Sequence, residues 1–184
     1  AGTEEEAESV RAALAQHKDR VHLTTLRFSE ATRDAVLDAL ATADVLHYCG
    51  HAFFDGPGDD QSGLLLADMQ KLTLRDLKDT SLVPRVVFFN ACEAGRVRGA
   101  FTTEAAAFAE LILQCGVEAY LGTYWQVGDK PAADFATGVY ARLSEGTTLE
   151  KAVAQARADL LRNKHPDWAN YILYGDGRFT LTKK

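Results

Sequence analysis

Two apolar segments of the chain lead to side chains that can carry out chemistry together. Residues 45–49 lead to His51, and residues 86–89 lead to Cys92. A cysteine thiolate is a strong nucleophile, and a nearby imidazole can supply or remove the proton. Two backbone N–H groups near the thiol would complete the site by holding the oxyanion that develops during attack. His51 and Cys92 are therefore candidates for a nucleophilic pair.

Each of the two residues also has an ordinary interpretation. A cysteine at the end of a strand is more often a small buried hydrophobe, and a histidine in a loop is more often merely solvated. In an open α/β sheet, ligands bind outside the carboxyl ends of the strands. If the two strands are parallel neighbours, thiol and imidazole emerge at one edge, but spacing alone leaves both interpretations open.

The strands and helices that must position His51 and Cys92 alternate along the chain. Strands are predicted over 21–26, 45–49, 64–66, 86–89, 117–123 and 171–174, and helices are predicted to begin near Thr3, Ser29, Thr73, Glu104, Pro131 and Thr148. Residues 86–89 are apolar without alternation, which is typical of a strand buried on both faces. The alternation predicts an α/β fold with a mainly parallel sheet and helices on both faces.

Length and composition restrict the class of protein. The 184 residues fit one domain, and the net charge of −6 comes without any block of Lys and Arg. We therefore expect no nucleic acid as a direct partner. No apolar run reaches the roughly 18 residues that span a bilayer, and no secretory leader is recognisable, so no membrane partner is expected.

The cysteines suggest a reducing compartment and no metal. Cys49, Cys92 and Cys115 are an odd number in a chain that needs no cross-link, which favours reduced thiols and a cytoplasmic location. Cys49 and Cys115 are expected to be core thiols. His47 lies two residues before Cys49 on the same strand, and Cys49 with His51 resembles a loose pair of metal ligands. No second pair of ligands accompanies it, so we expect no zinc and no cofactor. The acidic loop 55–60 lacks calcium-loop spacing and is interpreted as a solvated turn.

Four segments resemble the motifs of CHAT-domain peptidases, a group of the caspase-like clan that includes the separases. Residues 44–55 are similar to the family's histidine block and residues 86–95 to its cysteine block. The third and fourth segments, 122–129 and 168–175, resemble its Tyr-Trp and Val-x-Asp strand and its closing Trp-Ala motif. The segments occur in family order and extend over nearly the whole chain.

The resemblance implies a caspase-like three-layer sandwich and a role for individual residues. Cys92 would be the nucleophile and His51 its proton-transfer partner, with the backbone N–H groups of Ala52 and Cys92 forming the oxyanion hole. The family usually has glycine after the histidine, whereas this chain has Ala52. Alanine keeps the N–H but resists a positive φ by roughly 1 kcal/mol or more.

The resemblance also points to substrate contacts at Tyr124, Trp125 and Asp129. Asp129 can select a basic side chain, but a surface helix cap ahead of Pro131 is an equal alternative. The two aromatic residues either line the cleft or pack in the core.

The resemblance further implies that residues 1–184 are one CHAT domain lacking its first strand. That strand normally lies between the strands predicted over 21–26 and 45–49, so the chain is expected to be a segment of a longer polypeptide. The family's domains usually follow helical repeats or another sensor module, which is the expected partner in the same polypeptide or complex.

The sequence is compatible with three hypotheses about function. The first is a cysteine endopeptidase that acts on protein or peptide substrates as a bacterial effector switched on by a sensor or partner. The second is a catalytically weakened CHAT pseudo-peptidase that serves as an interaction module, which Ala52 makes plausible. The third, a flavodoxin-like ligand-binding domain, fits the α/β pattern but leaves the Cys and His blocks unexplained.

Overall fold

The structure is a computed structural model that describes residues 2–17, 21–54, 60–79, 83–93, 101–125 and 127–181. For residues 2, 16, 54, 91–93 and 101–107, the structure describes the backbone and not the side chains. The chain divides into two compact units, which are considered separately. Residues 24–126 form the sheet unit, and residues 1–23 together with 127–184 form the helical unit.

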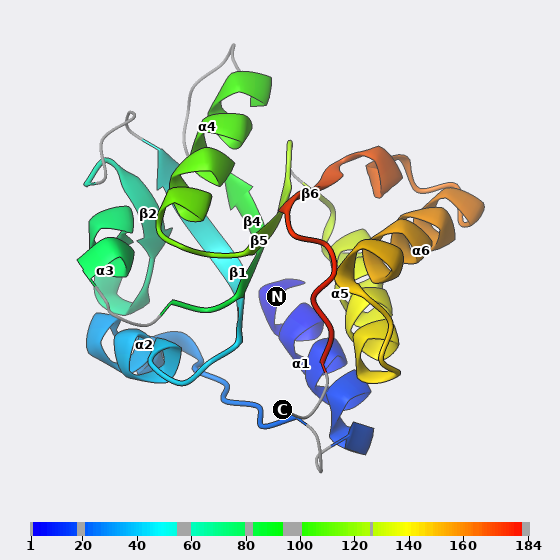
Figure 1. Ribbon diagram of the computed structural model, residues 1–184, viewed down its shortest axis with the longest axis horizontal. Helices are drawn as coiled ribbons and strands as arrows, with labels where there is room; N and C mark the ends of the chain where they lie inside the picture. The colour runs from blue at the N-terminus through cyan, green and yellow to red at the C-terminus, as the bar shows by residue number, and fades with distance from the viewer. Residues whose placement is uncertain are drawn as a thin grey trace. The chain divides into compact units, whose positions relative to one another are not determined.

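The sheet unit contains both candidate residues. Its strands lie in the order β3-β2-β1-β4-β5 (Figure 1), with bounds β1 Val45–Phe54, β2 Ser62–Leu65, β3 Lys71–Thr73, β4 Val86–Glu93 and β5 Ala119–Thr123. The pairs β1–β4 and β4–β5 are parallel, whereas β1–β2 and β2–β3 are antiparallel. The expected α/β class with a parallel-centred sheet is confirmed, and a short antiparallel pair extends the sheet beyond β1.

The interior of the sheet unit forms where the sequence predicted it. Residues 86–89 of β4 are at most 2 % exposed, which confirms a strand covered on both faces. The Phe89 ring meets Tyr120 of β5 edge-on at a centroid distance of 5.6 Å. Helix α4 (Phe101–Gln114) contributes Ile112, which is fully buried. Full burial of a large apolar side chain contributes about 1.5–3 kcal/mol, so these contacts hold β4 rigidly in the centre.

Two expectations for the first third of the chain are wrong. Residues 21–27 form no strand; His22 to Thr25 are exposed, so the segment has no buried face to place against a sheet. The second helix, α2 (Arg33–Leu40), is capped by Thr32 and not by Ser29. The Thr32 hydroxyl accepts a hydrogen bond from the Ala35 N–H at 3.3 Å. Ser29 lies instead in the short 3-10 turn Phe28–Glu30.

Helix α3 (Leu74–Asp79) begins at a reciprocal cap, as Thr73 predicted. The Thr73 N–H donates to Asp76 Oδ2 at 2.8 Å, and the Asp76 N–H donates to Thr73 Oγ1 at 3.3 Å. Arg33 Nη2 lies 2.6 Å from Asp76 Oδ1. The cap therefore joins the start of α2 to the start of α3.

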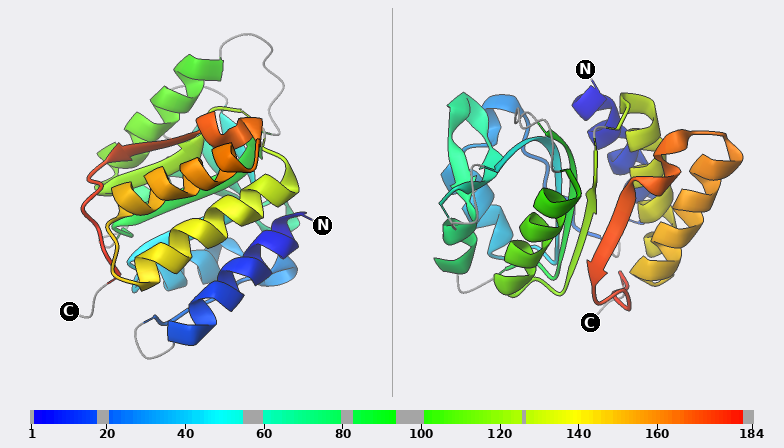
Figure 2. Two further views of the ribbon diagram at one scale, coloured as in Figure 1. Left: turned by 90° about the vertical axis from the view of Figure 1, so that its right-hand side faces the viewer. Right: turned by 90° about the horizontal axis from the view of Figure 1, so that it is seen from above.

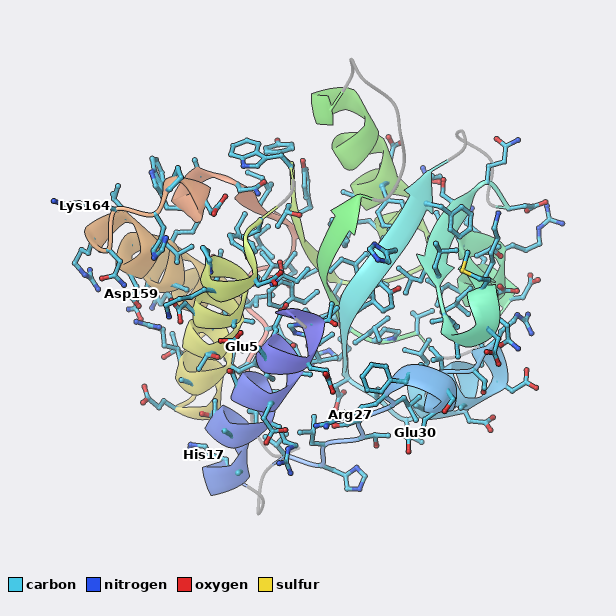
Figure 3. All side chains as sticks on the ribbon, turned by 180° about the vertical axis from the view of Figure 1, so that it is seen from behind. Glu5, His17, Arg27, Glu30, Asp159 and Lys164 are labelled. Carbon is cyan, nitrogen blue, oxygen red and sulfur yellow. The ribbon has the colours of Figure 1, made fainter. Side chains whose placement is uncertain are left out.

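The helical unit is built from three long helices. They are α1 Gly2–Leu14, α5 Asp129–Ser144 and α6 Leu149–Arg162, with α5 beside both α1 and α6 (Figure 2). Asp159 of α6, labelled in Figure 3, pairs with Arg142 of α5 at 2.5 Å. The strand β6 (Tyr171–Gly175) confirms the last predicted strand, and its Tyr171 stacks on Phe135 of α5 at 3.5 Å.

Among the described residues, no helix is both long enough and apolar enough to cross a lipid bilayer.

Candidate active site

The backbone places the two candidate residues opposite one another. In the parallel pairing of β1 with β4, His51 is the register partner of Cys92. Neighbouring strands of a sheet lie about 4.8 Å apart. The expectation that the two strands are parallel neighbours, with both residues toward the same end, is therefore confirmed. The side chain of Cys92 lies outside the description.

His51 and Cys92 lie within strands and not in the loops that were expected to follow them. Strand β1 continues past His51 to Phe54, and β4 continues to Glu93. Beyond Gly50, β1 acquires a second neighbour, because His51 to Phe54 pair with β2. This additional pairing explains why the strand does not stop at residue 49. The His51 side chain is exposed, and residues 55–59 of the acidic loop lie outside the described residues.

A tyrosine supports the backbone of the histidine block. The Tyr48 hydroxyl lies 2.9 Å from the His51 carbonyl oxygen and 2.5 Å from that of Leu65 on β2. Its single proton serves either carbonyl or is shared between them. Burial raises the pKa of Tyr48 to about 12, against the opposing effect of the hydrogen bond to His51. A proton is thus held firmly beside the His51–Ala52 peptide group.

Gly50 is needed because the Tyr48 ring crosses over it. A Cβ atom at Gly50 would lie 2.4 Å from the Tyr48 hydroxyl oxygen. Strand β5 repeats the arrangement, since a Cβ at Gly122 would lie 2.4 Å from the hydroxyl oxygen of Tyr120. These glycines provide space for a ring.

Ala52 occupies ordinary strand backbone. It pairs with Leu64 of β2 and with Glu93 of β4. Among the described residues other than glycine, a positive φ occurs at Phe28, Asp68, Met69 and Lys164, so the expected conformational penalty at Ala52 does not arise here. The N–H of a paired residue points along the sheet toward a neighbouring strand. For Ala52 to donate to a substrate, the end of β1 must leave that pairing.

The three residues predicted to contact substrate fall in both units. Tyr124 and Trp125 follow β5 in the sheet unit; their rings stack at 6.4 Å, and Trp125 is 45 % exposed. Asp129 is exposed in the first turn of α5 in the helical unit, where Gly128 is the N-cap. An acidic residue in a first turn interacts favourably with the helix dipole. Gln126 between them lies outside the described residues.

The sequence places His47 two residues before Cys49 on one strand, but the contact between the two side chains was not predicted. His47 Nε2 lies 3.0 Å from Cys49 Sγ, and both side chains are half-buried. Alternation along β1 was the available signal, since residues two apart share a face of the sheet. Cys115 is also half-buried, so neither thiol belongs to the fully buried core that was expected.

The fold and the backbone of the site define a class of protein. A cysteine and a histidine opposed on neighbouring parallel strands of an α/β sheet suit a caspase-like thiol hydrolase. The family model of the CHAT domain matches residues 1–176. The chain therefore belongs to the CHAT domain family, which is related to caspase-like cysteine peptidases. In the comparison with curated proteins, none matches this chain.

Proposed function

We propose that this chain is a cysteine endopeptidase in which Cys92 is the nucleophile and His51 the proton-transfer partner. The observation that carries the proposal is the register of β1 and β4, which pairs these two residues across neighbouring parallel strands. The match to the CHAT domain family supports the same assignment. Tyr124, Trp125 and Asp129 are proposed to contact the substrate, which is a protein or peptide.

The chemistry follows from the residue types. His51 accepts the Cys92 thiol proton, and the thiolate attacks the scissile carbonyl carbon. Negative charge develops on the carbonyl oxygen, where backbone N–H groups of Ala52 and Cys92 donate hydrogen bonds. His51 then gives its proton to the departing amine, leaving a thioester that water hydrolyses with His51 as base.

The proposed setting is a bacterial effector in the cytoplasm that a sensor or helical-repeat module switches on. The pairing of Ala52 on both sides supports a switched enzyme, because the oxyanion donor becomes accessible only when the end of β1 leaves its neighbours. A partner that binds this end of the sheet in the open form would shift the population toward activity.

The test combines a thiol-directed covalent probe with cleavage-site mapping. In the intact protein, we expect rapid labelling at Cys92 and new protein termini that are absent with Cys92→Ala. His51→Ala should reduce turnover by at least about 10³-fold. Cys115→Ala, which changes a thiol on another element, is the matched control and should retain turnover.

The second candidate is a pseudo-peptidase that acts as an interaction module. The replacement of the family's usual glycine by Ala52 favours it. A folded protein whose Cys92 labels no faster than Cys115, and whose Cys92→Ala variant generates the same termini, would establish this alternative and refute the peptidase.

A further inference from the structure

The strand that carries His51 also carries a second thiol–imidazole pair. His47 Nε2 and Cys49 Sγ are 3.0 Å apart. The two side chains lie on one face of β1, and Tyr48 between them lies on the other face. The His47 ring is held by Phe88 of β4, at a centroid distance of 4.5 Å and an interplanar angle of 58°. His47 and Phe88 are also register partners. Packing therefore fixes the imidazole beside the sulfur.

Cys115 shows what an ordinary thiol does in the same unit. Its Sγ lies 3.3 Å from the Leu111 carbonyl oxygen and 3.7 Å from that of Leu74. A carbonyl oxygen accepts a hydrogen bond from the thiol but is not a base at neutral pH. An imidazole nitrogen can take the proton, which converts the neighbouring sulfur to a thiolate. Both cysteines are half-buried, so exposure alone does not distinguish them.

We propose that Cys49 is a second activated thiol, a site of oxidation by peroxides with His47 as its base. The Cys49 sulfur attacks one peroxide oxygen, an S–O bond forms and the O–O bond breaks. The departing hydroxide takes the proton that His47 received from the thiol and leaves as water. Sulfur loses two electrons and becomes sulfenic acid, while the peroxide is reduced.

The position of Cys49 connects this chemistry to the dyad strand. Cys49 lies two residues before His51, so the two side chains share a face of β1 about 6.6 Å apart along the strand. Its register partner Asn90 lies two residues before Cys92. The oxygen added on oxidation lies beside the proposed proton-transfer residue. The assignment of the thiol itself does not depend on the proposed peptidase activity.

The test uses protein with Cys92→Ala, so that the proposed nucleophile cannot contribute. The protein is treated briefly with dilute hydrogen peroxide in the presence of a dione reagent that traps sulfenic acid, and peptides are quantified by mass spectrometry. We expect Cys49 to be trapped at least about tenfold faster than Cys115. A further His47→Gln substitution should reduce the Cys49 rate toward that of Cys115, and Cys49→Ser should remove the signal.

Unfolding supplies a second measurement that needs no change at His47. In concentrated urea, the rates at Cys49 and Cys115 should become similar, because the imidazole no longer faces the sulfur. Equal rates in the folded protein would overturn the proposal. The proposal would also be overturned if the trapping rate at Cys49 stayed high in a folded His47→Gln variant. A high trapping rate at Cys49 in urea would overturn it as well.

Discussion

Ala52 shows how a single side chain can control a backbone donor. Its N–H is proposed to hold the oxyanion, yet it lies in strand paired on both sides. Glycine weakens a strand by roughly 0.5–1 kcal/mol relative to alanine. A glycine at this position would let the end of β1 leave its neighbours more readily, and the N–H would then reach a bound carbonyl group.

We therefore predict that Ala52→Gly raises kcat, because one poorly placed oxyanion donor can cost on the order of 10²-fold in rate. The free energy of unfolding should fall by less than about 1 kcal/mol. Steady-state kinetics and urea unfolding measure the two quantities. Ala119→Gly, on β5 and therefore not on a strand that pairs with β1, is the control and should lower stability without raising kcat. A fall in kcat with Ala52→Gly would mean that the end of β1 functions only with alanine at this position.

The Tyr48 hydroxyl makes stability depend on alkaline pH. Its pKa is raised by burial to about 12, whereas an unfolded tyrosine titrates near 10. Between these values the unfolded state loses the proton and the folded state keeps it, so stability present below pH 10 is lost as pH rises toward 12. The loss amounts to at most about 2–3 kcal/mol.

Tyr48→Phe should remove this part of the alkaline loss while keeping the ring over Gly50. The measurement is urea unfolding at intervals between pH 9 and pH 12, roughly the range over which the two states titrate. Tyr120→Phe removes a hydroxyl from the equivalent arrangement on β5 and serves as the matched control. If wild type and Tyr48→Phe lose stability in parallel across this range, the hydroxyl does not titrate as described.

At the scale of elements, the cap between α2 and α3 carries the next prediction. Partial burial by itself raises the pKa of Asp76, but hydrogen bonds from Arg33 and Thr73 hold that pKa below its ordinary value of 3.8. A carboxylate with a lowered pKa stabilises the fold above its unfolded pKa. The stabilisation is lost as pH falls through the folded pKa.

Asp76→Asn should therefore lower the free energy of unfolding at pH 7 by about 1–2 kcal/mol, since a charge-assisted cap is lost. The variant should also show a shallower loss of stability below about pH 4. Asp34→Asn is the control, because Asp34 also lies near Arg33, at 3.8 Å, but is 93 % exposed. Equal effects from the two substitutions would contradict the role of the Asp76 cap.

Strands and helices were predicted best from the sequence where a buried face required a regular pattern of apolar side chains. Residues 86–89 read as a strand covered on both sides because every side chain is apolar, and β4 confirms it. Residues 21–26 are also rich in apolar and β-branched side chains, but local propensity cannot reveal that they pair with no strand among the described residues. The contact between His47 and Cys49 and the opposition of His51 and Cys92 both depend on register, which only the paired strands define.

At the scale of the whole molecule, the charge balance yields a prediction about partners. With 20 basic and 26 acidic residues, the chain has a net charge of −6, and counterion release offers no gain on a polyanion. Fluorescence anisotropy with labelled single- and double-stranded oligonucleotides at low salt should detect no binding, with a basic DNA-binding protein as positive control. Binding that weakens steeply with added salt would show a basic surface that total charge conceals.

The pairing of His51 with Cys92 has a consequence for how such a chain can change in evolution. The lengths of two segments, 45–51 and 86–92, are coupled. Val45 pairs with Val86, so His51 pairs with Cys92 only because each lies six residues further along its own strand. A single deletion within either segment would set the histidine beside a different residue and turn its side chain to the other face of the sheet. Descendants that keep the pair should therefore accumulate insertions and deletions in the connections between strands, while these two segments keep their lengths or change them together.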